Sequence, residues 1–229
     1  MQNVTAVGHR GDPYRFRENT IDSLRSALDR GADAVECDVR LTRDGVPVLL
    51  HDATLKRLWG RDRPLRSLSA AEVRGLTAGA VPTLAEALAA TDGSRLMLDL
   101  PGTREERTAR RIVDAVREAG ATDRVHYCAD AVAMLAVRAA DPSAEIALTC
   151  TSLAPPRPVL LAAVKPRWLN YRFSLVDRDL VARVHHDGFL LSVWTPDTRR
   201  ALRRLIDLGV DSVTTNRIDV LTALRDERG

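Results

Sequence analysis

The sequence predicts an α/β protein built as a (β/α)8 barrel, and three observations support this prediction. Short apolar runs alternate with segments of helical periodicity along the chain, which is typical of parallel strands joined by helices. Eight such runs remain when one short antiparallel return is set aside, and this barrel has eight strands. The length of 229 residues suits a single domain, which we expect to span residues 1–229.

The first half of the predicted barrel contains a hairpin. The first strand is expected at residues 4–8, and apolar residues at helical spacing follow it until Gly31. The second strand is expected at residues 32–41. The tight turn TRDG after it predicts that residues 46–51 return antiparallel, as a β-hairpin.

Residues 52–81 are less regular, and we expect them to form a short insertion or cap with one short helix at 67–76. Regular alternation resumes after this segment. The later strands are expected near residues 95–100, 124–128, 145–149, 167–171, 189–194 and 211–214. The later helices are expected near residues 82–91, 104–119, 130–140, 177–187, 197–208 and 217–226, with a loop and a short helix over 151–166.

Composition excludes several classes of protein. The formal net charge is only +3, the arginines are interleaved with acidic residues, and aromatic residues make up 4% of the chain. These features argue against a nucleic-acid partner, which needs a basic surface with stacking side chains. The cysteines, Cys37, Cys128 and Cys150, show no CxxC spacing, which argues against a disulfide framework or a zinc site.

Targeting and membrane signals are weak. Residues 1–12 contain no apolar stretch of signal-peptide length, and no run reaches the ~18 apolar residues of a membrane span. We therefore expect a cytoplasmic protein without a transmembrane segment, acting on a small molecule. The oligomeric state stays open.

Carboxylates gather where predicted strands end. In such a barrel the active site lies at the carboxyl ends of the strands. Glu36 and Asp38 share one face of the second strand, and Asp99 ends the third barrel strand. Carboxylates on an interior face repel one another unless a cation lies between them, and oxygen ligands suit Mg²⁺, Ca²⁺ or Mn²⁺.

Two histidines complete a candidate catalytic site. His9 and Arg10 follow the first strand, and the return at 46–51 brings His51 to the level of Glu36 and Asp38. Arginine binds phosphate oxygens in a bidentate manner, and histidines act as general bases and acids. A metal that polarises a phosphoryl oxygen between two histidines is suited to phosphodiester cleavage.

Structural alternatives exist for several of these residues. Glu36 and Asp38 could pair with Arg40 in an interior salt bridge. Asp99 could cap the following helix, and Glu18 could favour a helix N-terminus through the helix dipole.

Further candidates follow the later strands, although each has a structural alternative. Arg172 follows the sixth barrel strand, Trp194 ends the seventh, and Asn216 follows the eighth. Arg172 could be a surface arginine, and Trp194 could serve packing alone.

An ordered set of motifs connects these residues to a known family. The segments GHRG, ENT, the E-x-D of VECDV, TRDGVPVLLHD, PTLAEAL, VWTPD and GVDSVTTNR resemble the glycerophosphodiester phosphodiesterase family, between residues 8 and 217. The resemblance implies a TIM barrel of the phospholipase C-like phosphodiesterase type, one divalent cation (Mg²⁺ or Ca²⁺, with Mn²⁺ as a further choice) and histidine-based hydrolysis of glycerophosphodiesters.

The family's functional residues carry over onto matching positions. The E-x-D pair, a metal-ligand pair in the family, falls on Glu36 and Asp38. The remaining matches are the catalytic His9 and His51, the phosphate contact Arg10, the ENT residue Glu18, and Trp194 against the alcohol part of the substrate.

The chain departs from the family pattern in three places. The family shows Glu-x-Lys at the end of the third strand, where this chain has Asp99 and Pro101. Asp99 is then the third metal ligand, and Arg172 is a candidate to replace the lost lysine charge. Asp197 stands where the WTxN motif has asparagine. The segment after His51 is short, so we expect an open site that accepts a larger or different substrate.

Two functions from different classes remain open. The first is a metal-dependent hydrolase that cleaves glycerophosphodiesters or related lysophospholipids to an alcohol and glycerol 3-phosphate or a cyclic phosphate. The loss of the lysine at Pro101 suggests an alternative, a non-catalytic phosphodiester-binding barrel with a degenerate site.

Overall fold

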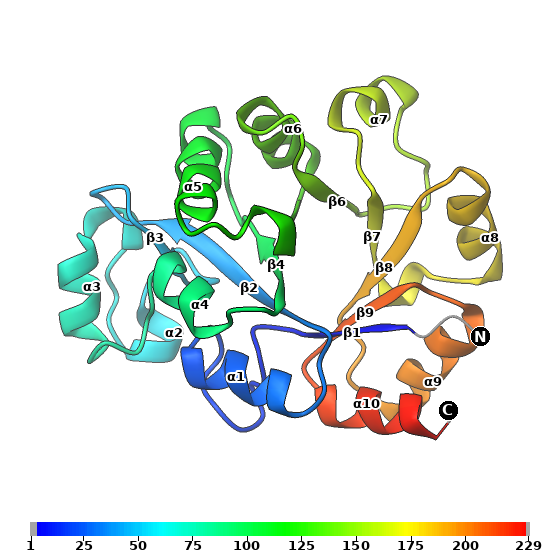
Figure 1. Ribbon diagram of the computed structural model, residues 1–229, viewed down its shortest axis with the longest axis horizontal. Coiled ribbons are helices and arrows are strands. Elements are labelled where there is room, and N and C mark those ends of the chain that lie inside the picture. Colours follow the sequence, from blue (N-terminus) through cyan, green and yellow to red (C-terminus); the bar gives the residue numbers. More distant parts are fainter. Residues whose placement is uncertain (1–3, 228–229) are drawn as a thin grey trace.

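Eight parallel strands close into a barrel in the computed structural model, which describes residues 4–227 (Figure 1). Each barrel strand pairs with the next in parallel, and the last pairs with the first, so the predicted fold is confirmed. The barrel strands are β1 (Thr5–Gly8), β2 (Ala34–Leu41), β4 (Arg95–Asp99), β5 (Val125–Ala129), β6 (Glu145–Cys150), β7 (Trp168–Arg172), β8 (Leu190–Trp194) and β9 (Ser212–Thr215).

Helices surround the barrel, as the alternating pattern predicts (Figure 1). Several begin at a residue whose side chain accepts a hydrogen bond from a backbone N–H of the first turn, as Thr20, Asp130 and Asp177 do. The helices are α1 (Ile21–Asp29), α4 (Leu84–Ala90), α5 (Glu106–Glu118), α6 (Ala131–Ala140), α7 (Pro158–Val164), α8 (Arg178–His186), α9 (Arg199–Leu208) and α10 (Ile218–Asp226).

The alternation of side chains along β2 separates the packed core from the site. Val35, Cys37 and Val39 are fully buried and belong to the main hydrophobic cluster between strands and helices. Glu36 and Asp38 therefore face the barrel interior. Apolar residues fill another part of the barrel, where Met97, Cys128 and Ala147 pack with Trp168.

The predicted hairpin is present. Strand β3 (Pro47–Leu49) pairs antiparallel with β2, and Val39 lies opposite Leu49. The backbone N–H of Leu50 donates to the carbonyl of Asp38 over 2.9 Å. This register returns His51 to the level of Asp38, as the turn chemistry predicts.

Residues 52–81 form a cap with a small apolar core of its own. The cap contains α2 (Lys56–Trp59), a 3₁₀ turn at Leu65–Ser67 and α3 (Ala70–Leu76). Its core consists of Val48, Leu50, Leu55, Leu65, Leu68, Val73 and Val81. The expected helix at 67–76 begins later, at Ala70, because Ser69 and Glu72 form a capping box; α2 was not expected.

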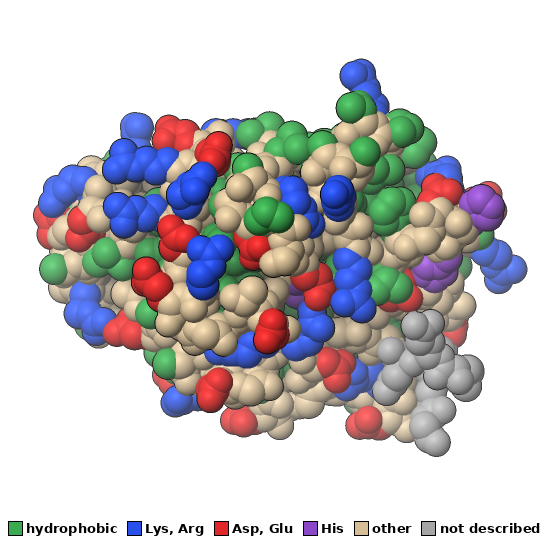
Figure 2. Space-filling view, turned by 45° about the horizontal axis from the view of Figure 1, so that its top comes forward, with side chains coloured by type: hydrophobic (Ala, Val, Ile, Leu, Met, Phe, Trp, Pro, Cys, Tyr) green, Lys and Arg blue, Asp and Glu red, His purple; other side chains and the backbone are tan. Residues whose placement is uncertain are grey.

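Charged side chains of both signs are interspersed over the face shown in Figure 2. This distribution agrees with the alternation of arginines and acidic residues in the sequence. In residues 4–227, no helix has both the length and the apolar character needed to cross a membrane.

Candidate functional site

The loop after β1 folds back tightly and presents its backbone to β2. Arg10 and Gly11 both have positive φ, of 58° and 88°. A Cβ on Gly11 would lie 2.3 Å from a backbone atom of Ser23, so only glycine fits beside α1. The fold of this loop lets the backbone N–H of Arg10 donate to Glu36 Oε2 over 2.8 Å.

Three carboxylates meet at the carboxyl ends of β2 and β4. Glu36, Asp38 and Asp99 each offer an oxygen, and the three oxygens lie within 4.8 Å of one another. Asn19 holds Asp38 from both sides, because its amide donates to Asp38 Oδ2 over 2.8 Å and its oxygen accepts from the Asp38 N–H over 3.0 Å. Asn19 was not among the predicted site residues, although it lies inside the ENT motif.

The electrostatics of this cluster fit a divalent cation. Burial, together with the charges of Asp38 and Asp99, raises the pKa of Glu36 well above its usual value. Burial and the charge of Asp38 raise the pKa of Asp99 to about 7. A cation would relieve this repulsion, and three carboxylate oxygens match the preference of hard divalent ions. The donor set alone does not distinguish Mg²⁺, Ca²⁺ and Mn²⁺.

The structure shows that Arg10, and not Arg40, forms the ion pair with this cluster. Arg10 Nε lies 3.0 Å from Asp38 Oδ2, at an angle that makes the contact an ion pair rather than a hydrogen bond. Arg40 Nε instead donates to the carbonyl of His51 over 2.7 Å. The alternative of an interior salt bridge through Arg40 is therefore wrong.

His9 is held in one tautomer by a chain of two side chains. Asp197 accepts from the Asn216 amide nitrogen over 2.7 Å and from the Asn216 backbone N–H over 2.9 Å. Because a carboxylate can only accept, Asn216 Oδ1 must face His9 Nδ1, 2.8 Å away. His9 Nδ1 therefore carries a proton and Nε2 has a free lone pair, 3.9 Å from Glu36 Oε2. Burial and the charge of Arg10 lower the pKa of His9.

Exchange of Asp197 and Asn216 tests this arrangement. Asp197→Asn should lower kcat about 10–100-fold with little change in KM, because Asn216 is then free to turn its amide nitrogen toward His9. The double variant Asp197→Asn/Asn216→Asp should recover most of this loss, since an acceptor again faces His9 Nδ1. Steady-state kinetics on the three proteins measures this; an unchanged kcat in the single variant contradicts the assigned tautomer.

His51 belongs to a second charged network. Its Nδ1 lies 2.8 Å from Asp52 Oδ1, which leaves Nε2 free on a side chain that is 41% exposed. Arg57 donates to Glu18 and, over 2.6 Å, to Asp52. The hydrogen bonds that Asp52 forms with Arg57 and His51 lower the pKa of Asp52 to about 2. Glu18 in turn accepts from Arg10 Nη1 over 2.8 Å. The network thus links the cap to the phosphate-binding candidate Arg10.

The geometry contradicts the two helix-terminal roles considered for Asp99 and Glu18. Asp99 does not cap a helix, because α5 begins at Glu106 after Glu105, while Asp99 accepts only the N–H of Leu100 among the described residues. Glu18 lies outside α1, whose N-cap is Thr20, and it pairs with two arginines. Burial alone would raise the pKa of Glu18, but the hydrogen bonds from Arg57 and Arg10 lower it.

Arg172 and Trp194 lie opposite each other at the ends of β7 and β8. Arg172 is exposed, and the indole Nε1 of Trp194 is buried without a hydrogen-bond partner among residues 4–227. A buried donor without a partner is energetically costly. Arg57 and the role of Asp197 were not anticipated, because only the fold brings them to the histidines. Asp52 was also missed, although it directly follows His51 in the sequence.

Together these features define a hydrolase-type barrel, in which His9 lies beside an acidic cluster suited to a divalent cation, at the carboxyl ends of the strands. The model of the glycerophosphoryl diester phosphodiesterase family matches residues 9–220. The chain therefore belongs to this family of phosphoric diester hydrolases, and the resemblance noted in its motifs is confirmed.

Individual proteins of this kind are similar to the chain over most of its length. A glycerophosphodiester phosphodiesterase of Caldanaerobacter subterraneus subsp. tengcongensis is 27% identical over 244 residues, which cover 95% of this chain and 96% of that protein. A crystal structure of a phosphodiesterase from Oleispira antarctica, in complex with the product sn-glycerol-3-phosphate, matches with a TM-score of 0.90 at 23% identity and covers 97% of this chain and 96% of that one. A glycerophosphodiester phosphodiesterase structure from Thermotoga maritima matches with a TM-score of 0.85 at 21% identity and covers 98% and 99%.

Proposed function

We propose that this protein hydrolyses glycerophosphodiesters, releasing an alcohol and glycerol 3-phosphate. One observation carries the proposal: Glu36, Asp38 and Asp99 lie within 4.8 Å of one another, beside a histidine whose free Nε2 faces them. A divalent cation held by these carboxylates would polarise a phosphoryl oxygen and offset the charge that develops there.

Each side chain has a role that its surroundings support. His9, kept neutral by its lowered pKa, accepts a proton at Nε2 from the attacking hydroxyl group. Arg10 is anchored by Asp38 and Glu18, and its Nη2 has no partner among the described residues, so it can bind a phosphate oxygen. His51, on the other side, donates a proton to the leaving alcohol. Trp194, half-buried at the end of β8, packs against the alcohol or glycerol part.

The nature of the attacking group separates two versions of this reaction. Attack by water gives glycerol 3-phosphate directly, whereas attack by the substrate's own 2-hydroxyl gives a cyclic phosphate first. In both versions His9 removes the proton. Phosphorus NMR of the early product distinguishes them.

Product release from a panel of substrates tests the proposal. Glycerophosphocholine, glycerophosphoethanolamine, glycerophosphoglycerol and a lysophospholipid are incubated with Mg²⁺, Ca²⁺ or Mn²⁺, or with EDTA. We expect cation-dependent release of glycerol 3-phosphate or its cyclic form from the glycerophosphodiesters, and of the corresponding acylated phosphate from the lysophospholipid. Absence of turnover with every substrate and cation would instead favour a phosphodiester-binding barrel, the alternative that Pro101 suggests.

Arg172 is proposed to supply the positive charge that the lysine at the position of Pro101 provides in the family. Arg172→Ala should raise KM about tenfold or more. The cation-induced rise in Tm should stay unchanged, because Arg172 does not pair with the three clustered carboxylates. Arg178→Ala, an exposed arginine on α8, is the control. Unchanged kinetics in Arg172→Ala would exclude this role.

A further inference from the structure

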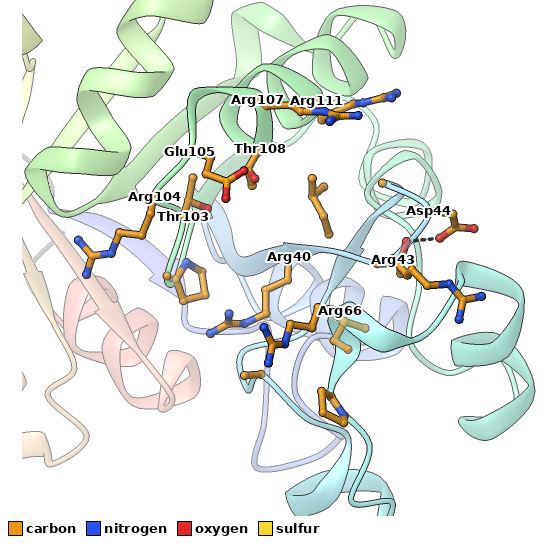
Figure 3. Close-up of a pocket in the computed structure, with 18 of the residues that line it drawn as sticks. Arg40, Arg43, Asp44, Arg66, Thr103, Arg104, Glu105, Arg107, Thr108 and Arg111 are labelled. Carbon is orange, nitrogen blue, oxygen red and sulfur yellow. Dashed lines mark hydrogen bonds between the residues drawn. The ribbon is translucent and has the colours of Figure 1, made fainter.

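A broad cleft of about 980 Å³ lies between the β2–β3 hairpin, the cap and the start of α5 (Figure 3). This volume is at the upper end of the range for sites that hold small molecules. Its walls include Ala53 and Thr54, directly after His51 and Asp52, and Pro101, two residues after Asp99. The cleft therefore begins where the candidate site ends, on the side of His51.

The lining of this cleft is strongly basic. Two acidic residues line it, Asp44 and Glu105. Its arginines are Arg40, Arg43, Arg66, Arg104, Arg107 and Arg111. Six positive and two negative side chains give the lining a formal charge of +4, whereas the whole chain carries +3. The positive charge is thus concentrated here, and the lining contains no aromatic residue on which a nucleic-acid base could stack.

Several of these arginines have no protein partner. Arg43 pairs with Glu72, and Arg104 pairs with Asp130 over 3.1 Å. Arg66, Arg107 and Arg111 form no hydrogen bond or ion pair within the part of the chain that the structure describes. Figure 3 shows that Arg66 comes from the cap, whereas Arg107 and Arg111 come from α5. Arg107 and Arg111 lie four residues apart on α5. Like charges at this spacing destabilise a helix slightly, so helix stability does not explain why these two arginines are present.

The start of α5 adds uncharged donors to the same wall. The N-cap residue Glu105 makes no side-chain hydrogen bond to the first turn of this 13-residue helix. The backbone N–H groups of Glu106 and Arg107 therefore have no partner among the described residues, while that of Thr108 donates to the Glu105 carbonyl. Helix N-termini favour anions. Asp44 is already occupied, because it accepts from the N–H of Ala70 and the hydroxyl of Thr42. The cleft thus combines unpaired cations with free N–H donors.

From these observations we infer that the cleft is a second anion-binding subsite for the leaving alcohol, so that preferred substrates carry a further phosphate on that alcohol. The inference rests on the proposed function, in which His51 protonates the leaving oxygen. Arg40, which lines the cleft, donates its Nε–H to the carbonyl of His51 and so connects the cleft to His51.

Two substrates that differ only in this phosphate test the inference. Glycerophosphoinositol has a neutral leaving alcohol, and glycerophosphoinositol 4-phosphate has the same alcohol with a phosphate. The native protein should show a kcat/KM about tenfold higher for the phosphorylated substrate at low salt, and the difference should shrink as salt is added. Arg66→Gln/Arg107→Gln should bring the ratio of the two kcat/KM values close to one. Arg178→Gln/Arg200→Gln, which removes two exposed arginines outside the cleft, should keep it.

Equal kcat/KM values for the two substrates in the native protein would overturn the inference, even though turnover itself would support the proposed function. An equal drop of the ratio in the control variant would also overturn it, since long-range charge would then suffice. Calorimetry measures the binding of inositol 4-phosphate and so tests the anion-binding subsite without catalysis. About tenfold weaker binding in Arg66→Gln/Arg107→Gln supports the subsite even if no diester is cleaved, and equal binding contradicts it.

Discussion

Glu36→Gln is expected to abolish hydrolysis and, at the same time, to stabilise the cation-free protein. The variant removes one of three clustered carboxylates, so cation binding and kcat/KM should fall about a thousandfold or more, equivalent to roughly 4 kcal/mol. It also removes a buried charge that is 3% exposed and repelled by Asp38 and Asp99. In EDTA at pH 8 we expect a gain of about 1–3 kcal/mol in the free energy of unfolding.

Loss of cation binding together with higher stability in EDTA distinguishes a carboxylate that binds a cation from one that only stabilises the fold. Thermal unfolding with and without Mg²⁺, Ca²⁺ or Mn²⁺ measures it: the native protein should gain stability on adding the cation, and Glu36→Gln should not. Glu118→Gln, at the exposed end of α5, is the matched control and should behave like the native protein. A lower Tm of Glu36→Gln in EDTA would show that Glu36 stabilises the fold through its hydrogen bond from Arg10.

The same charges predict how stability depends on pH. The pKa of Asp99 is about 7 in the folded protein and near 3.8 in an ordinary environment. Between these values the folded state retains a proton that the unfolded chain has lost, so the contribution of Asp99 to the free energy of unfolding in EDTA should fall as pH rises from about 4 to 7. This contribution is roughly 2–4 kcal/mol, and the raised pKa of Glu36 acts in the same direction, whereas the lowered pKa values of His9 and His126 act in the opposite direction. Denaturant unfolding of the native protein and of Asp99→Asn at a series of pH values isolates the contribution of Asp99; a difference between the two proteins that does not change with pH contradicts it.

His51→Ala and His9→Ala are expected to lower kcat/KM about 10²–10⁴-fold, with cation-induced stabilisation retained. The two variants should differ in their dependence on the leaving group. If His51 protonates the leaving alcohol, its loss should matter much less for a p-nitrophenyl diester of glycerol phosphate, because nitrophenolate leaves without a proton. Loss of His9 should slow both substrates alike, since the attacking hydroxyl still needs a base.

Kinetics on glycerophosphocholine and the nitrophenyl diester distinguishes the two roles. His186→Ala is the control, because His186 is 88% exposed on α8, outside the site. If His9→Ala is the variant rescued by the better leaving group, the roles are reversed. If both variants retain full activity, acid–base catalysis by these histidines is excluded.

Most of the fold could be predicted from local patterns. Alternating apolar runs located all eight barrel strands, and the TRDG turn located the hairpin that returns His51 to Asp38. These features depend on neighbours in the sequence, since side-chain periodicity and turn chemistry act over a few residues. The boundary of α3 and the short helix α2 were missed, because caps and tertiary packing in residues 52–81 determine them.

The sequence by itself determined the barrel, the order of its strands and which polar residues end them. These features follow from side-chain periods of two residues in strands and 3.6 in helices, which depend only on residues close in the sequence. Only the tertiary structure decided which charges meet. It paired Asp38 with Arg10 rather than Arg40, aligned Asp197, Asn216 and His9, and collected arginines from β2, the cap and α5 in one cleft. These contacts join residues far apart in the chain, and their partners follow from the closure and register of the barrel.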